Sequence, residues 1–313
     1  MTAGWTLRPF TPADAPALAA LLGLTGRVTT PEALLAADAA RPAEVPRRWL
    51  LVDERGEVLS GSQLRPFAFL PPTFRQVGVL VLPQWRGQGV GQRLWVDAKQ
   101  AAEAEGAGGL SADVSDTDAA SLAWAQRRGF AIYTHRFASE LDLTAFDPTP
   151  FQADVQRAVA QGVTFTDLSS TDETTLQRYL NSVADRLTET PDLMGYPRWS
   201  LAQVRAELRL DRDPRPDWLV VALGPQGQWW GTSATLLFRD PPFAYNALTA
   251  IHSEARGRRL ALPLKLEGIA RAQAAGLSVM RTNNHASNAP MLAVNRRLGF
   301  EPRPGRYEVQ RRL

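Results

Sequence analysis

Residues 79–91 read Val-Leu-Val-Leu-Pro-Gln-Trp-Arg-Gly-Gln-Gly-Val-Gly, and the expected fold follows from this stretch. An apolar strand ends at Pro83, which cannot donate a hydrogen bond to a neighbouring strand. Alternate glycines follow, and glycine permits positive φ and close approach of a ligand. A helix begins at once, so that successive backbone N–H groups and the helix dipole favour a bound anion. The stretch predicts a cradle for a phosphate or pyrophosphate; a plain strand–helix turn is the alternative.

Two common phosphate-binding loops do not fit these residues. A dinucleotide-binding turn needs a third glycine where Gln92 stands. A Walker A loop needs Gly-Lys followed by Ser or Thr, whereas Gly91 is followed by Gln92 and Arg93. The cradle is therefore of another kind.

The chain contains a second copy of this unit. Residues 256–261 read Arg-Gly-Arg-Arg-Leu-Ala, and Gly-Phe pairs occur at 129–130 and 299–300. The first Arg of each turn lies 43 residues before the glycine of its pair, and the copies are offset by 170 residues. Trp-Leu-Leu-Val at 49–52 matches Trp-Leu-Val-Val at 218–221, at an offset of 169 residues. One spacing held over a whole unit predicts two tandem domains; a coincidence of Gly-Phe pairs is the alternative.

Both copies show the same predicted order of elements, β-α-α-β-β-β-α-β-α-β, which indicates a mixed α/β fold. We expect helices at 12–22, 31–40, 89–104, 172–186, 200–210 and 258–275, and strands at 5–7, 49–53, 58–67, 75–82, 163–165, 218–223, 229–238 and 243–253. Asp172 and Ser200 are expected N-caps, and Gly106 and Gly276 are expected to end helices. Prolines at 148 and 150 mark the join, so the predicted domains are residues 1–147 and 151–313.

Composition excludes several classes of function. The 313 residues include no cysteine and only three histidines, so no metal site is expected. The formal net charge of +3 does not indicate nucleic-acid binding. No signal peptide is visible at the N-terminus, and no apolar run approaches the roughly 20 residues of a membrane helix. A cytoplasmic protein without a membrane partner is the default expectation.

The sequence resembles the GNAT superfamily of acyl-CoA-dependent N-acyltransferases, once in each half, in the tandem arrangement. Arg86, Gly89 and Gly91 fit its fingerprint (Gln/Arg)-x-x-Gly-x-(Gly/Ala). The family's second motif, Asn-x-x-Ala-x-x-x-Tyr-x-x-x-Gly-Phe, falls in the first copy on Asp118, Ser121, Ala125, Gly129 and Phe130, and in the second on Asn288, Met291, Asn295, Gly299 and Phe300.

The resemblance implies acetyl-CoA, or another acyl-CoA, as cosubstrate. Its pyrophosphate would bind the N–H groups of residues 87–92, its pantetheine arm would pair with residues 79–81, and the N–H of Val81 would stabilise the oxyanion. The implied binding residues are Val79, Leu80, Val81, Arg86, Gly87, Gln88, Gly89, Val90, Gly91 and Gln92 in the first copy, and Thr249, Ala250, Ile251, Arg256, Gly257, Arg258, Arg259, Leu260, Ala261 and Asn288 in the second.

Two departures from the family pattern separate the copies. Arg259 stands where the first copy has Gly89, and its β-carbon is expected to obstruct a tight cradle, although its guanidinium could itself bind phosphate. The family's tyrosine general acid is replaced by Ala125 and Asn295. We expect the first copy to grip CoA better and the second to carry more of the chemistry, with Asn295 as a hydrogen-bond donor to the thiolate.

N-acyl transfer needs an uncharged amine, so a base must remove a proton. His252 and Glu254 follow the strand that leads to the second cradle, and His252 titrates in the useful range. A packing histidine and a solvated turn carboxylate are the alternatives. His285 is a third candidate, and His135 is expected to be structural.

The leading hypothesis is an N-acetyltransferase that acts on a primary amine of a small molecule or peptide. The loop 188–196 is expected to shape the acceptor pocket, and the two copies are expected to let the chain work as a monomer. Two alternatives remain open: a non-catalytic acyl-CoA-binding or sensing protein, and a duplicated protein with one purely structural half.

Overall fold

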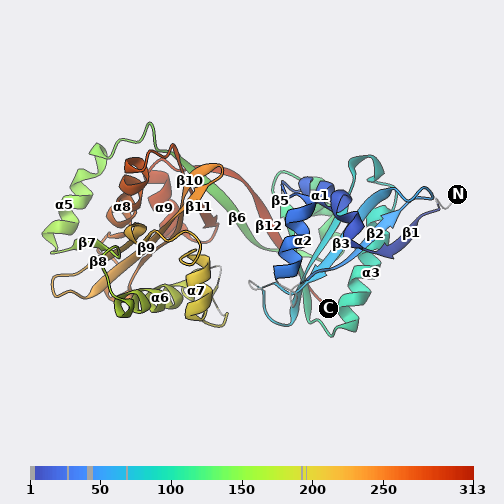
Figure 1. Ribbon diagram of the computed structural model, residues 1–313, viewed down its shortest axis with the longest axis horizontal. Coiled ribbons are helices and arrows are strands. Elements are labelled where there is room, and N and C mark those ends of the chain that lie inside the picture. Colours follow the sequence, from blue (N-terminus) through green and yellow to red (C-terminus); the bar gives the residue numbers. More distant parts are fainter. Residues whose placement is uncertain (1–3, 27, 41–44, 68–69, 192, 195) are drawn as a thin grey trace. The chain divides into compact units, whose positions relative to one another are not determined.

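The computed structural model describes residues 4–26, 28–40, 45–67, 70–191, 193–194 and 196–313 (Figure 1). The chain forms two compact units. Unit 1 comprises Met1–Thr134 and Arg306–Leu313, and unit 2 comprises His135–Gly305. Each unit is a mixed sheet flanked by helices, so the expected α/β class is confirmed.

The strands of unit 1 follow the order β1-β2-β3-β4-β5-β12. Its elements are β1 (Thr6–Pro9), α1 (Ala15–Gly23), α2 (Pro31–Ala40), β2 (Arg47–Val52), β3 (Val58–Arg65), β4 (Phe74–Val81), α3 (Val90–Ala104), β5 (Gly109–Ser115), α4 (Ala119–Gln126) and β12 (Glu301–Arg312), of which residues 306–312 pair with β5.

The strands of unit 2 follow the order β6-β11-β10-β9-β8-β7. Its elements are β6 (Ala131–Asp142), α5 (Gln152–Ala160), β7 (Thr164–Asp167), α6 (Glu173–Leu187), α7 (Leu201–Glu207), β8 (Leu219–Leu223), β9 (Trp229–Arg239), β10 (Pro242–Ile251), α8 (Ala261–Ala274), β11 (Val279–His285) and α9 (Ala289–Arg297).

The last strand of each half of the sequence belongs to the other unit. β6 follows α4 in the chain but pairs antiparallel with β11, from Arg136 opposite His285 to Asp142 opposite Val279. β12 ends the chain and pairs antiparallel with β5. The compact units therefore differ from the ranges 1–147 and 151–313, because pattern within each half cannot show which sheet a final strand joins. The helix α5, after the proline-rich join, was also missing from the expected order.

In both units the two central strands pair briefly and then diverge. β4 and β5 are parallel and pair only from Phe74 opposite Gly109 to Gln76 opposite Ser111. In unit 2, β10 and β11 pair only at Ala244–Met280 and Tyr245–Arg281. Beyond these pairs, one edge of β4 and of β10 is open. We call the two openings the strand splits.

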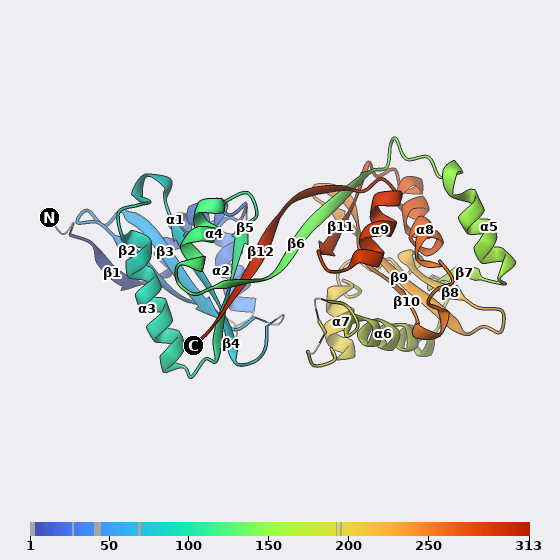
Figure 2. The same cartoon turned by 180° about the vertical axis from the view of Figure 1, so that it is seen from behind.

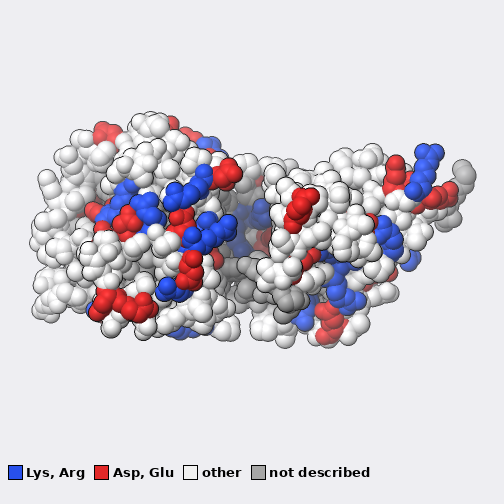
Figure 3. Space-filling model, viewed as in Figure 1, with Lys and Arg blue, Asp and Glu red and all other residues white. Residues whose placement is uncertain are grey.

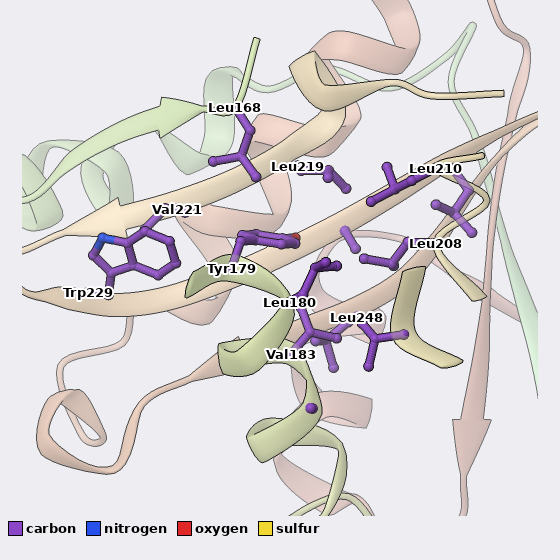
Figure 4. Close-up of a cluster of buried hydrophobic side chains, with 14 residues drawn as sticks. Leu168, Tyr179, Leu180, Val183, Leu208, Leu210, Leu219, Val221, Trp229 and Leu248 are labelled. Atoms are coloured by element: carbon purple, nitrogen blue, oxygen red, sulfur yellow. The ribbon is translucent and has the colours of Figure 1, made fainter. Parts of the chain in front are cut away.

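Apolar side chains pack helices onto both faces of each sheet. In unit 2, α6 and α7 cover one face, and α8 and α9 cover the other (Figures 1 and 2). Figure 4 shows Tyr179, Leu180 and Val183 of α6 turned toward Leu219 and Leu248 of the strands. The hydroxyl of Tyr179 donates to the carbonyl of Ser233 at 2.6 Å, which satisfies this buried polar group.

Local signals for helix ends are confirmed. The carboxylate of Asp172 accepts from the N–H of Thr175, and the hydroxyl of Ser200 accepts from the N–H of Gln203. Gly106 and Gly276 adopt φ of 68° and 73° just after α3 and α8. Among the described residues, no helix combines the length and the apolar character needed to cross a membrane.

Candidate functional site

The first cradle lies between β4 and α3. Gly87 and Gly89 adopt φ of 76° and 87°, a conformation that other residues rarely take. A Cβ atom added to either glycine would meet no protein atom within 4 Å, so the turn leaves open space for a ligand. A Cβ on Gly91 would lie 3.3 Å from the side chain of Val81, so this glycine brings α3 close to β4.

The hydrogen bonds of β4 show which backbone groups face the split. The N–H of Leu82 donates to Leu59 of β3, and strand residues alternate in direction, so Leu80 also faces β3. The backbone groups of Val79 and Val81 therefore face the split, where a strand-like ligand could pair with them. The guanidinium of Arg86 donates to the Val81 carbonyl at 3.2 Å and ties the cradle to this strand.

The second cradle repeats this backbone in unit 2. Gly257 adopts φ of 82°, and Arg259 adopts φ of 60° where the first copy has Gly89. Arg259 takes the left-handed conformation of the glycine it replaces, so the backbone of the second cradle follows that of the first. That conformation costs on the order of 1–2 kcal/mol for a residue with a β-carbon. A strained residue kept at this position is consistent with the expected role of the Arg259 guanidinium in binding phosphate.

The strand beside the second cradle has the same alternation. The N–H of His252 donates to the carbonyl of Trp230 on β9, so the backbone groups of Ala250 also face β9. The backbone groups of Thr249 and Ile251 therefore face the split. A β-bulge interrupts the pairing of β10 with β9 between Asn246 and Leu248. Unit 1 has no such shift in the register of β3 with β4. Only the second copy therefore bends its central strand at the apex of the split.

His252 contacts a residue that the sequence did not single out. Its Nε2 lies 3.0 Å from the hydroxyl of Ser182 on α6. The imidazole of His252 is partly buried, and this burial is the main reason that its pKa lies below the usual value. The positive charge of the nearby Arg186 lowers the pKa further. The ring is therefore uncharged at neutral pH, the form that can accept a proton. No local signal in the sequence marks Ser182, because it meets His252 only when α6 packs on the sheet.

The other predicted bases lie in more open places. Glu254 is exposed on the 3-10 turn Ser253–Ala255. His285 ends β11, and its Nδ1 lies 2.7 Å from the hydroxyl of Ser287. The ring of His135 lies 5.4 Å from that of Phe137. Of these groups, His252 alone unites partial burial, a polar partner and a position at the end of β10.

The expected acceptor loop contacts the second cradle. Arg256, the first residue of that cradle, pairs with Glu189, which also pairs with Arg186 at 2.9 Å. Asp192 and Gly195 of this loop lie outside the described residues. The ion pair between Arg256 and Glu189 therefore ties the second cradle to the loop 188–196.

Asn288 and Asn295 have different surroundings. The side chain of Asn288 caps α9 by accepting from the N–H of Met291 at 3.3 Å, as Asp118 caps α4. Asn295 is buried and accepts from the Nζ of Lys265 at 2.5 Å. Asn295 therefore belongs to the interior under the split, and the capping of α9 already uses the Asn288 side-chain oxygen.

Charges of both signs are interspersed on the face of unit 2 seen in Figure 3. Within the described ranges, no group of three or more His, Asp or Glu side chains could hold a metal ion.

Comparison with known proteins agrees with this geometry. The model of the Acetyltransferase (GNAT) family matches residues 18–130. A tandem GNAT protein from the clavulanic acid biosynthesis pathway aligns over 98% of both chains, with 23% identity and a TM-score of 0.68. The chain has the tandem GNAT fold. A GCN5-related N-acetyltransferase from Sphaerobacter thermophilus shares this tandem GNAT fold with 17% identity and a TM-score of 0.68, over 98% of this chain and 95% of the other.

A third structure matches only part of its own chain. It is a GCN5-related glucosamine N-acetyltransferase region of a fungal multi-domain GH3 β-N-acetylglucosaminidase, with 15% identity and a TM-score of 0.73. The alignment covers 99% of this chain and 38% of that one. No sequence among curated proteins matches the chain.

Proposed function

We propose that the protein transfers an acetyl group from acetyl-CoA to a primary amine, and that unit 2 performs the chemistry. The observation that carries this proposal is His252, held by Ser182 at the end of β10 and directly before the second cradle. Unit 1 has Leu82 at the corresponding position and Ala125 where unit 2 has Asn295. The second unit therefore offers the groups that acyl transfer needs.

The residues fit a CoA thioester in a defined order. The amides that follow Arg256 would hold the pyrophosphate at the start of α8. The pantetheine arm would extend along β10 and pair with Ile251 and Thr249, which face the split. The thioester would then lie beside the end of β10, where the N–H of Ile251, the residue that corresponds to Val81, turns into the split and can donate to the carbonyl oxygen.

His252 would act on the amine. The amine nitrogen attacks the thioester carbonyl carbon and passes its surplus proton to the uncharged imidazole. The C–S bond then breaks, its electron pair leaves on sulfur, and the products are an amide and the thiolate of CoA. Ser182 would orient the ring through its contact with Nε2.

A panel of amines with acetyl-CoA tests the proposal. Thiol release is measured with polyamines, amino acids, aminoglycosides and peptide N-termini, for the wild type and for His252→Gln. We expect release with at least one amine class and its loss in the variant. Binding of acetyl-CoA without release for any amine would contradict catalysis.

The second candidate function is acyl-CoA binding without turnover, and unit 1 favours it. Its cradle is open and both of its left-handed positions are glycine, yet its interior is apolar at Ala125 and Val114. Thermal melting with acetyl-CoA and its unreactive thioether analogue separates the two functions. Equal stabilisation by both ligands, without consumption of acetyl-CoA by any amine, would favour sensing.

A further inference from the structure

The interior under the split differs in polarity between the two units. The 170-residue offset pairs polar positions of unit 2 with apolar positions of unit 1. The pairs are Thr249 with Val79, Lys265 with Trp95, Thr282 with Ala112, Asn284 with Val114, and Asn295 with Ala125. All five residues of unit 2 are buried. A fold that accepts apolar residues at these places does not need polar ones for its stability.

The polar side chains form two connected groups. The hydroxyl of Thr282 on β11 donates across the split to the carbonyl of Asn246 at 3.0 Å, and the hydroxyl of Thr249 donates to the Asn246 side chain at 3.2 Å. Thr282 and Asn284 alternate along β11 and so share one face. The groups therefore line the split from its apex to the helices above it.

Lys265 stands at one end of a chain of amides. Its Nζ donates to Asn295, whose Nδ2 donates to the Oδ1 of Asn284 at 2.8 Å. The Nδ2 of Asn284 in turn donates to the hydroxyl of Ser139 at 2.8 Å. Because an ammonium group can only donate, it fixes the direction of every amide that follows.

The other contact of Nζ is the face of the Phe300 ring, at 4.6 Å from its centroid. Neither an amide oxygen nor an aromatic ring carries a full negative charge, so burial lowers the pKa of Lys265 to about 7. In unit 1, Trp95 packs edge-on against Phe130 at 5.4 Å instead.

Three ion pairs engage charged side chains on the elements around Lys265. These pairs are Glu267 with Arg271 on α8, Arg297 of α9 with Asp154, and Arg281 of β11 with Glu140. The positive charge at Nζ is therefore available to a negative charge that forms in the split.

We propose that Lys265 is a positioning residue for acyl transfer in unit 2, whose ammonium group orients Asn295 and stabilises the CoA thiolate as it departs. The inference rests on the proposed function. As the C–S bond breaks, the sulfur gains the electron pair and becomes a thiolate. The positive charge of the Lys265 ammonium, which is bound to Asn295, stabilises this negative charge. Lys265 contributes this field from the interior without itself touching the reacting atoms.

The thiolate absorbance of bound CoA tests this directly. The protein carries Gly89→Glu to disable the first cradle, CoA is bound, and the ultraviolet absorbance of its thiolate is followed against pH. Lys265→Met removes the charge, and Lys265→Gln removes the charge but can still donate to Asn295. Trp95→Phe is the matched control at the equivalent position of unit 1.

We expect the bound thiol to ionise about 1.5 pH units higher in both Lys265 variants, which is the shift for unit charges ~8 Å apart at an effective dielectric constant of ~20. Trp95→Phe should leave the ionisation unchanged. In turnover, Lys265→Met should lower kcat about tenfold with little change in KM for acetyl-CoA. Equal ionisation of bound thiol with and without Lys265 would overturn the inference and leave the proposed function standing. If the Gly89→Glu protein binds no CoA, the second cradle is not a CoA site, and this result would contradict both the inference and the proposed function.

Discussion

The Nζ atom of Lys265 lies 2.5 Å from the Oδ1 of Asn295, and both side chains are buried in unit 2. The two residues lie on different helices and meet above the strand split. Burial penalises the charge of a lysine in such a place and lowers its pKa to about 7, so both charge states are populated near neutral pH. Both the pKa of Lys265 and its effect on the pH dependence of stability can therefore be measured.

The titration can be observed directly, because the chain has only two lysines, Lys99 and Lys265. Carbon-13 labelling of lysine should give two side-chain signals in the NMR spectrum, and Lys99→Gln assigns them. We expect the pKa of Lys265 to be about 7. A value near 10 would show that Nζ is solvated or paired with a carboxylate.

Stability should depend on pH through the same group. Because the pKa of Lys265 is lowered from 10.5 to about 7, the unfolded chain binds more protons between these values, so stability rises with pH in this window. The slope is at most about 1.4 kcal/mol per pH unit. Lys265→Met should flatten the rise and stabilise the protein below pH 7, as measured by urea unfolding. An unchanged slope would contradict the buried charge.

His252 should dominate the pH dependence of transfer. His252→Gln is expected to lower kcat/KM by about 10²–10⁴, the usual contribution of a general base. Because the pKa of His252 is lowered, the wild type should lose activity only as pH falls below the ordinary histidine range near 6.5. His285→Gln is the matched control and should retain most activity. Loss of activity in His285→Gln together with retained activity in His252→Gln would show that His285 is the base.

The exchanged strands predict where substitutions act. Val309 of β12 is fully buried in the core of unit 1, and Leu141 of β6 is buried in that of unit 2. Val309→Ala should destabilise unit 1 although it lies in the second half of the sequence, and Leu141→Ala should destabilise unit 2. Each should cost on the order of 1–4 kcal/mol. Native-state hydrogen exchange assigns the loss to a unit, and losses confined to the half of the sequence that carries each residue would exclude the exchange.

The sequence predicted the features that depend on local pattern. Glycines at 87 and 89 permit a left-handed backbone, and both adopt it in the structure. Asp172 and Ser200 cap the helices that follow them. The 170-residue offset predicted two units of the same fold. Each of these signals lies within a few residues or repeats at a fixed spacing.

Features that depend on long-range packing were not predicted. A final strand has the same alternating pattern whichever sheet it joins, so the exchange of β6 and β12 leaves no local trace. Ser182 and His252 lie 70 residues apart and meet only when α6 packs on the sheet. Lys265 opposite Trp95 was visible in the aligned copies, since a charged residue at a core position signals a special environment.

Calorimetric titration with acetyl-CoA of the wild type, Gly89→Glu and Gly257→Glu tests the cradles most directly. Both glycines have positive φ and open space, so glutamate adds strain and a negative charge at the expected phosphates. Gly56→Glu, at a turn with φ of 81°, is the control for strain alone. We predict that each cradle variant loses one binding event and that Gly56→Glu binds like the wild type. Unchanged binding in both cradle variants would contradict the account.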